Sequence, residues 1–407
     1  MRITSLLSKL LCLKHVRVLG VHFHNGGLVV DVAPTTRVPR CSGCGRKAHV
    51  GYDERPRRWR HLDLAGMTLH LQGVLRRVKC RHCGVLIERV PWAEPASWFT
   101  REFEDQVAYL AQRCDATTVS CLMRMSWRTV GEVVQRVVAR RSTGDPLDGL
   151  TIIGVDELSY RRHHEYVTIV VDHVQQRVVW ARPGKNADTL KAFFEALGPE
   201  RCAQLEAVTI DMSGAYIKAV TEATPQAQII FDRFHIQRLA HDAVDEVRRA
   251  EVRQAATQED KSALKKTRWA LQKNPWNLTG TEKNKLAEVQ HANKPLYRAY
   301  LLKESLLDVL DRHQVHLAES KLDEWLTWAR RSRLTPFVKL AGTVHKYRDG
   351  ILAYVRTRLS NGRTEALNGK IRTITRRAYG FHSATNLIAL IMLCCSGLAM
   401  SPIFHYA

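Results

Sequence analysis

Hydrophobic and polar positions change their period along the chain, and each change marks a different kind of element. Residues 20–34 form two short alternating runs around Asn25-Gly26-Gly27, a combination typical of a tight turn between paired strands. Residues 101–141 show helical spacing in three successive runs. Residues 140–149 (RRSTGDPLDG) then collect the Gly, Pro and Asp that are typical of a linker. This pattern predicts strands first, a helical triplet next, and a domain boundary near the linker.

Beyond the linker, the pattern predicts a mixed sheet. Three β-branched runs follow one another, namely TIIGVDELSY, EYVTIVVDHV and RVVWARPG. A helix at about 188–198, a strand in LEAVTID, a second helix and a strand in AQIIFDRFHI come next. Consecutive strands followed by alternating helices and strands favour a sheet that is antiparallel first and parallel later. The segment 235–358 is almost wholly helical in pattern, and 361–400 predicts two helices broken at Tyr379-Gly380.

The net charge of the chain indicates the kind of partner that it binds. The chain has 407 residues, of which 62 are Lys or Arg and 40 are Asp or Glu, giving a net charge of +22. The excess is concentrated, with +11 in residues 1–100, +8 in 241–360, +4 in 361–407 and −1 in 151–240. Such a balance implies a polyanion, either nucleic acid or an anionic membrane surface. The apolar run 387–400 is short for a membrane span of about 20 residues, so we expect a cytoplasmic protein whose polyanionic partner is nucleic acid.

Cysteines predict a metal centre in the first basic region. Cys41 and Cys44 form one CxxC pair, and Cys80 and Cys83 form a second. In a reducing compartment, two such pairs favour one structural Zn²⁺ held by four thiolates over disulfides. The gap between the pairs exceeds that of a short ribbon, so the intervening chain is expected to fold back as strands. Two chance pairs, or a redox pair, are the alternative.

Basic side chains around the cysteines are candidates for DNA contact. Arginines with an interleaved tryptophan suit phosphate and base contacts, and a merely solvated basic face is the alternative. The candidates in this region are Arg57, Arg58, Trp59, Arg76 and Arg77.

The helical triplet at 103–140 is compatible with a helix-turn-helix whose recognition helix is 125–140. Ser126 is the expected N-cap of that helix, and Thr117 and Thr118 are the expected caps of the one before it. Arg128 is then a candidate DNA contact. Net charge over 101–150 is zero, so a plain helical spacer is the alternative.

Two carboxylates close apolar strands in the second half of the chain. Asp156 ends IIGVD, and Asp211 ends AVTID. Carboxylate oxygens at one edge of a sheet are the ligands that Mg²⁺ prefers, with phosphates and waters completing the coordination. Asp232 also ends a strand, beside His235, and a supporting role is expected for both; a fourth ligand is the alternative for Asp232.

A third acid is expected on a late helix. Ser360-Asn361-Gly362 signals a helix start, after which Glu365, Asn368 and Arg372 share one face. Glu365 is the only acid after residue 350, and Arg372 and Arg376 are placed to meet phosphates. An ordinary helix face is the alternative.

Four segments together resemble one known family. These are GVDELSYRRHHEYVTIVVD, TIDMSGAYIKAV, FDRFHI and SNGRTEALNGKIRTITRRAYG. Over nearly its whole length the chain resembles the ISL-type insertion-sequence transposases of bacteria, which are DDE enzymes. The resemblance implies a catalytic triad of Asp156, Asp211 and Glu365 holding two Mg²⁺ or Mn²⁺ ions, and an RNase H-like five-stranded core interrupted by a helical insertion.

The resemblance implies metal-dependent cleavage of double-stranded DNA at terminal inverted repeats, followed by strand transfer into target DNA. It also implies a nucleoid-associated protein that works as a homodimer or larger synaptic assembly. The alternatives are a DNA-binding regulator without catalysis and an RNase H-like nuclease without strand joining. In the insertion, Trp269, Trp276, Trp325 and Trp328 are expected mostly to pack in the core, with stacking on an unpaired base as the alternative. The expected domains are 1–95 (zinc finger), 96–145 (helix-turn-helix), 150–240 (first part of the core), 241–358 (insertion) and 359–407 (C-terminal helices of the core).

Overall fold

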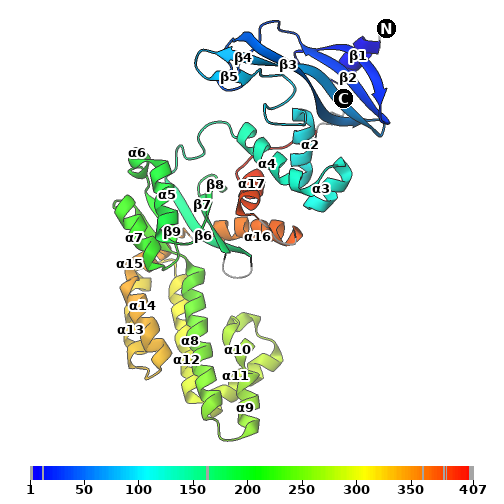
Figure 1. The fold of residues 1–407 in the computed structure, drawn as a ribbon. Coiled ribbons are helices and arrows are strands. Elements are labelled where there is room, and N and C mark those ends of the chain that lie inside the picture. Colours follow the sequence, from blue (N-terminus) through cyan, green and yellow to red (C-terminus); the bar gives the residue numbers. More distant parts are fainter. Residues whose placement is uncertain are drawn as a thin grey trace. The chain divides into compact units, whose positions relative to one another are not determined.

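The computed structural model describes residues 3–11, 13–161, 165–359, 362–378, 381 and 383–402, without the side chains of 50–52 and 362–365 (Figure 1). Two compact units divide the chain. The first joins Met1–Thr143 to Thr385–Ala407, and the second is Gly144–Ala384. The boundary at Thr143 falls inside the predicted linker. Each unit is described by itself.

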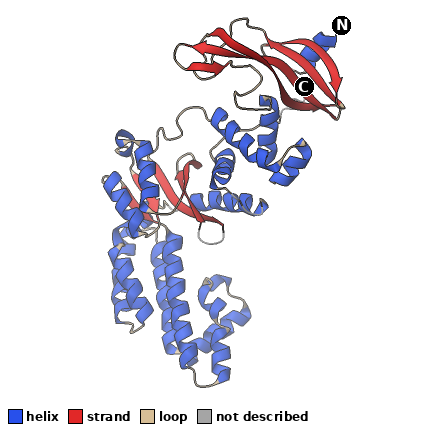
Figure 2. Cartoon of the chain, in the orientation of Figure 1, coloured by secondary structure: helices blue, strands red, loops and turns tan. Residues whose placement is uncertain are grey.

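A five-stranded sheet begins the first unit (Figure 2). Its strands run in the order β1-β2-β4-β3, with β5 paired to β4. Asn25 and Gly26 have φ of 48° and 73° and form the predicted turn between the first two strands. Alternate side chains of the sheet meet in a core with Trp59, Leu69 and Trp92. The elements are α1 Ile3–Leu10, β1 Val16–His24, β2 Gly27–Pro34, β3 His49–Leu64, β4 Met67–Cys80 and β5 Gly84–Ile87.

Three helices follow, as predicted: α2 Arg101–Ala111, α3 Ala116–Met123 and α4 Trp127–Arg141. The expected caps were partly wrong. Asp115 caps α3 by accepting hydrogen bonds from the backbone N–H groups of Thr117 and Thr118, because its carboxylate lies one residue before the helix. Ser126 occupies the N-cap position of α4 but makes no side-chain cap hydrogen bond.

Helix α17, Ala384–Cys395, completes the core of these three helices. Its Ala389 and Leu393 are buried in one cluster with residues of α2 and α4. Gln112 on the segment after α2 donates to the Leu393 carbonyl oxygen at 2.7 Å, and Gln135 on α4 donates to the side-chain oxygen of Asn386 at 2.7 Å. We expected all of 359–407 to belong to the second unit, but α17 belongs to the first, because its apolar side chains fill this helical core.

The second unit is built on a mixed five-stranded sheet in the order β10-β9-β6-β7-β8. The first three strands of that order are mutually parallel, and β6, β7 and β8 are antiparallel neighbours. This is the predicted arrangement, and it is the strand order of an RNase H-like core. The elements are β6 Ile152–Arg161, β7 Glu165–Asp172, β8 Arg177–Pro183, α5 Ala187–Leu197, α6 Pro199–Cys202, β9 Ala207–Ile210, α7 Gly214–Ala223 and β10 Gln228–Phe231.

Helices occupy the chain from β10 to residue 357, as predicted. Gly350, in the last of them, packs on the sheet: a Cβ there would lie 2.4 Å from the Phe231 ring. The elements are α8 Arg233–Gln254, α9 Gln258–Lys265, α10 Arg268–Gln272, the 3-10 helix η1 Pro275–Asn277, α11 Gly280–Ala292, α12 Lys294–Asp311, α13 Val315–Arg331, α14 Thr335–Lys346 and α15 Arg348–Thr357. Helix α16, Gly362–Arg377, returns to the sheet; the predicted start at Ser360-Asn361 and break at Tyr379-Gly380 lie outside the described residues.

The insertion tryptophans do not all pack in the core. Trp325 is buried and donates from its indole nitrogen to the Leu302 carbonyl oxygen at 2.8 Å. Trp269, Trp276 and Trp328 are 62%, 73% and 38% exposed, so the expectation of core packing for most of the four was wrong. In the described part of the chain, no helix is both long and apolar enough to cross a membrane.

Candidate active site and zinc site

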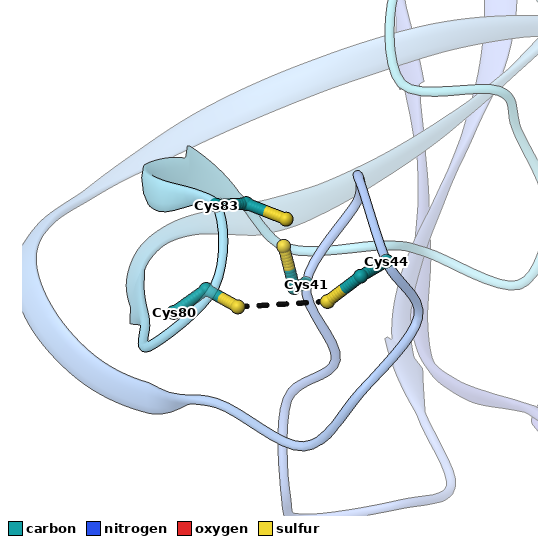
Figure 3. A group of neighbouring side chains, drawn as sticks. All are labelled: Cys41, Cys44, Cys80 and Cys83. Carbon is teal, nitrogen blue, oxygen red and sulfur yellow. Dashed lines mark hydrogen bonds between the residues drawn. The ribbon is translucent and has the colours of Figure 1, made fainter.

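The four predicted cysteines converge on one point (Figure 3). Their Sγ atoms all lie within 4.8 Å of one another, and those of Cys44 and Cys80 are 3.5 Å apart. The long β3–β4 hairpin fills the gap between the two CxxC pairs and brings them together. Gly45 and Gly84 have φ of +69° and +75°, which lets each turn reverse tightly. Four sulfurs at this spacing fit a tetrahedral Zn²⁺, whose Zn–S bonds are about 2.3 Å.

Backbone groups prepare one of these thiols for metal binding. Hydrogen bonds from the backbone of His82 and Cys83 lower the pKa of Cys80 to about 6. The pKa of Cys83 is raised to about 12 by its hydrogen bond with Cys44 and by burial. While no cation is bound, therefore, the thiol of Cys83 is harder to ionise than that of Cys80. A divalent ion supplies the charge that makes four thiolates stable together.

Most basic candidates around the zinc site have partners within the protein. Arg76 forms a two-pronged pair with the buried Glu88, at 2.9 and 2.6 Å. Arg77 is paired with Asp53, and Arg58 donates to the Gln72 side-chain oxygen at 2.6 Å. Arg76 thus holds the sheet together, while Arg58 and Arg77 keep exposed surface.

Trp59 is a correction. It is 1% exposed and packs edge-on against Trp92 at 5.3 Å between ring centroids, so it is a core residue and cannot contact DNA. Trp98 is an exposed aromatic ring in this region, and no sequence signal pointed to it. It is 64% exposed, and the Arg57 guanidinium lies 4.3 Å from its ring centroid. Arg128 is exposed near the start of α4, as expected.

Sheet register aligns the candidate carboxylates of the second unit. Gly154 pairs with Thr209 on the neighbouring parallel strand, so Asp156 and Asp211 lie at the same level two residues further on. Phe231 pairs with Ile210, which places Asp232 at that level on the third strand. Parallel neighbours in register direct their side chains to the same face. Asp156 does not end its strand as expected, since β6 continues beside β7; it lies where the pairing with β9 has stopped.

Burial dominates the electrostatics of Asp156. Desolvation raises the pKa of its carboxyl group, and the nearby charge of Asp211 adds to that rise. Opposing contributions come from the Glu157 backbone N–H, from Asn368 and from His235. Two neighbouring, partly buried carboxylates are costly without a cation. This donor set fits a hard divalent metal ion.

Helix α16 reaches this carboxylate through Asn368. The buried Asn368 donates a side-chain hydrogen bond to Asp156 Oδ2, across 212 residues of sequence. Glu365 lies in α16 one turn earlier, but its side chain is outside the described residues. Arg372 and Arg376 are exposed on the same helix. Asn368 was seen in the sequence as part of a helix face, but nothing there indicated that it would bind Asp156.

The remaining neighbours are His235, Asp232 and Glu157. His235 Nε2 lies 3.9 Å from Asp232 Oδ2, at the start of α8. Burial raises the pKa of Glu157, and Tyr216 opposes that rise by a hydrogen bond. Tyr216, on α7, is also 3.0 Å from the Thr168 hydroxyl. No sequence signal pointed to Glu157 or Tyr216.

A cavity of about 610 Å³ adjoins Asp211. Its lining comes from the end of β9, from α8 and from α14, and includes three basic residues that the sequence argument missed. The lining includes Asp211, Ser213, His235, Arg238, Lys339, Gly342, Lys346 and Tyr347.

A zinc ribbon, a helical triplet and an RNase H-like sheet with aligned carboxylates are together the arrangement expected of a DNA transposase, and the family comparisons support that class. Residues 153–391 match the transposase domain of the DDE class in family ISL3, and residues 88–138 match the helix-turn-helix domain of transposase family ISL3. Residues 37–83 match the zinc-finger of transposases IS204, IS1001, IS1096 and IS1165. The chain belongs to the ISL3 family of insertion-sequence transposases.

Two relatives extend this comparison to most of the chain. The chain is 42% identical over 398 residues to the transposase for insertion sequence element IS1557 of Mycobacterium tuberculosis, covering 91% of this chain and 89% of the relative. It is 29% identical over 360 residues to the transposase for IS1001 of Bordetella parapertussis, with coverage of 87% and 88%. The chain is therefore a DNA-binding enzyme of a class that cleaves and rejoins DNA.

Proposed function

We propose that Asp156, Asp211 and Glu365 are the catalytic acids of this transposase. The alignment of Asp156 with Asp211 on adjacent parallel strands supports the first two. The bond from Asn368 to Asp156 supports the third, because it brings α16 to this edge of the sheet one turn from Glu365. All three acids would hold Mg²⁺ or Mn²⁺.

The divalent ions would supply positive charge at the attacked phosphodiester, lowering the cost of its transition state. The protein residues have separate tasks. Asp156 and Asp211 provide the charged oxygens, and Asn368 fixes the orientation of Asp156. His235 lies close enough to stabilise the carboxylate form of Asp156. In cleavage, a water oxygen attacks phosphorus and the strand's 3′ oxygen leaves, giving a 3′-OH and a 5′-phosphate. In strand transfer, that 3′-OH attacks a target phosphorus and the target strand's own 3′ oxygen leaves. In both steps the attacking oxygen loses a proton and the leaving oxygen gains one.

The N-terminal unit would bind the terminal inverted repeats. Arg58, Arg77 and Arg128 present exposed guanidinium groups there, and Arg57 lies against exposed Trp98. Arg372 and Arg376 on α16 would contact the backbone of the DNA near the acids. Two ends have to be cut and joined, so the working form would be a homodimer or a larger assembly.

The test uses DNA carrying the inverted repeat that flanks the gene, with Mg²⁺. Asp156→Asn, Asp211→Asn and Glu365→Gln are each expected to lower cleavage by at least about 10³-fold while DNA affinity stays within twofold. Glu195→Gln, on the exposed face of α5, is the matched control and should cleave normally. Cleavage retained by any one acid variant would remove that residue from the triad, and a 3′-OH end that is never joined would indicate a nuclease instead.

A further inference from the structure

The cavity beside Asp211 has walls from two parts of the second unit. One wall is the end of β9 and the segment leading to α7, with Asp211 and Ser213. The others are α8, with His235 and Arg238, and α14, with Lys339 and Lys346. The helical insertion thus provides part of the surface around a proposed catalytic acid.

Three cations line this cavity and have no carboxylate partner among the described residues. Arg238, Lys339 and Lys346 are all exposed. In the part of the chain that the structure describes, none of them has a carboxylate within 4.0 Å. Arg248 and Arg249, further along α8, instead share the carboxylate of Asp245 at 2.7 Å each. Cations that remain unpaired beside a carboxylate-bearing cavity are available to an anionic ligand.

The spacing of these cations indicates an extended anion. Lys339 and Lys346 are seven residues apart on α14, which corresponds to about 10 Å along the helix axis. Successive phosphates of one strand advance about 3.4 Å along duplex DNA, so this spacing spans roughly three of them. Arg238 adds a third positive charge from α8. Cations distributed along a helix in this way suit a DNA strand, which presents several phosphates in a row, better than a single small phosphate.

The cavity wall between Lys339 and Lys346 has open space, because the residue there is a glycine. Gly342 lies between them on α14, and a Cβ at this position would meet no atom within 4 Å. A larger side chain would therefore enter the cavity without disturbing the helix. Tyr347, whose ring lies 5.0 Å from the Lys346 ammonium group, forms the end of the wall.

We propose that Arg238, Lys339 and Lys346 bind consecutive backbone phosphates of the DNA strand that enters the active site, so that the insertion positions the substrate at Asp211. This inference rests on the proposed function for the role of Asp211. The three cations are positioning residues, since they are placed to hold the strand and do not reach the reacting atoms through any described contact.

Binding is measured in EDTA with a labelled duplex carrying the flanking inverted repeat, from 50 to 300 mM salt. Arg238→Gln, Lys339→Gln and Lys346→Gln should each weaken binding, and each should reduce the slope of log K against log salt by about 0.9. Arg330→Gln is the matched control, because Arg330 is exposed on α13 and does not line the cavity. The proposal would be overturned by an unchanged salt slope for the three variants, or by an equal loss of DNA affinity for Arg330→Gln.

A second variant blocks the space and leaves every charge in place. Gly342→Met should fold, because Met is a better helix former than Gly, and should raise the KM for DNA at least tenfold with kcat within about threefold. Gly280→Met is the matched control, because a Cβ at Gly280 on α11 also meets no atom within 4 Å and Gly280 does not line the cavity; it should resemble the native protein. Native KM in Gly342→Met would count against the cavity as the binding site. If the three charge variants reduce the salt slope as expected but the native protein never cleaves DNA, the proposed function fails while the phosphate site stands.

Discussion

Asn368 connects the last long helix of the core to the carboxylate of Asp156, and this single contact organises the proposed active site. Its amide donates to a carboxylate whose pKa burial has raised. Hydrogen bonds to a charged group contribute about 1.5–3 kcal/mol. Asn368 therefore both orients Asp156 and favours its charged form.

Asn368→Ala should lower kcat for DNA cleavage about 10- to 100-fold while DNA affinity is unchanged. The lost hydrogen bond should raise the pKa of Asp156 further, so the acid limb of the pH–rate profile should move to higher pH. Thr373→Ala, on an exposed position of the same helix, is the control. A profile that falls in height but does not move would limit Asn368 to a packing role.

His61 makes the stability of the N-terminal unit depend on pH. It is 4% exposed, its Nδ1 lies 2.8 Å from the Thr100 hydroxyl, and burial with the charge of Arg60 lowers its pKa to about 4. Because this folded pKa is below the ordinary value of 6.5, the unfolded chain binds more protons between the two values. Stability present above pH 6.5 should therefore be lost as pH falls towards 4, by roughly 3 kcal/mol in all.

Replacing His61 with Gln should flatten this dependence. Urea unfolding of native protein and of His61→Gln would be compared from pH 7 to pH 4.5, with the exposed His24→Gln as control. Equal slopes in native protein and His61→Gln would show that other groups govern acid unfolding.

At the scale of elements, the sequence predicted those features whose signals are local. The CxxC spacing predicted the zinc site, and apolar strands followed by Asp predicted the aligned Asp156 and Asp211. Trp59 was misjudged because its arginine neighbours suggested a DNA surface, although strand alternation between Arg58 and Arg60 places it on the buried face. The cavity could not be predicted, since Lys339 is 128 residues from Asp211 and only the packing of α8 and α14 brings them to one space.

Removal of the zinc ion tests whether it stabilises the two CxxC turns. Cys44→Ser, or treatment with a strong chelator, should unfold the two CxxC turns and weaken DNA binding at least tenfold, because zinc binding free energy is folding free energy in such small sites. Cys121→Ser is the matched control, since Cys121 is an exposed free cysteine outside the cluster. One zinc per chain by elemental analysis is expected for native protein and Cys121→Ser; native-like DNA binding by zinc-free protein would contradict a structural role.

Helix α17 contributes to the stability of the helix-turn-helix. Leu393 is fully buried in its core, and Leu393→Ala should cost about 2–5 kcal/mol in the free energy of unfolding. Leu122→Ala, at a residue that is 60% exposed on α3, should cost less than about 0.5 kcal/mol. Chemical denaturation followed by tryptophan fluorescence measures both, and equal costs would show that α17 does not stabilise this unit.

Across the whole molecule, positive charge is carried by both units. The first has 24 basic and 11 acidic residues, and the second has 38 and 29, so their net charges are +13 and +9. The unit with the zinc site therefore has the larger excess in fewer residues. Each unit can attract DNA independently, and binding by the intact chain should fall steeply with salt.

We predict that two or more copies of the chain assemble on DNA. Each chain offers one pair of the proposed catalytic aspartates, Asp156 and Asp211, in its described residues, and a transposition event must act on two ends. Light scattering after size exclusion should give a mass of two chains, or a multiple of two, with two end duplexes. A mixture of native and Asp156→Asn chains should lose activity more than in proportion to the variant added. One chain per duplex at every concentration would contradict this.

The late position of α17 in the sequence also affects when the helix-turn-helix can finish folding during synthesis. About 240 residues separate α4 from α17, and the ribosome adds roughly 5–20 residues each second. For tens of seconds, a growing chain therefore carries α2, α3 and α4 without the helix that completes their core. Recognition of the element's ends by a fully packed helix-turn-helix must wait until the catalytic core has already been made, so an unfinished chain is a poor competitor for those ends.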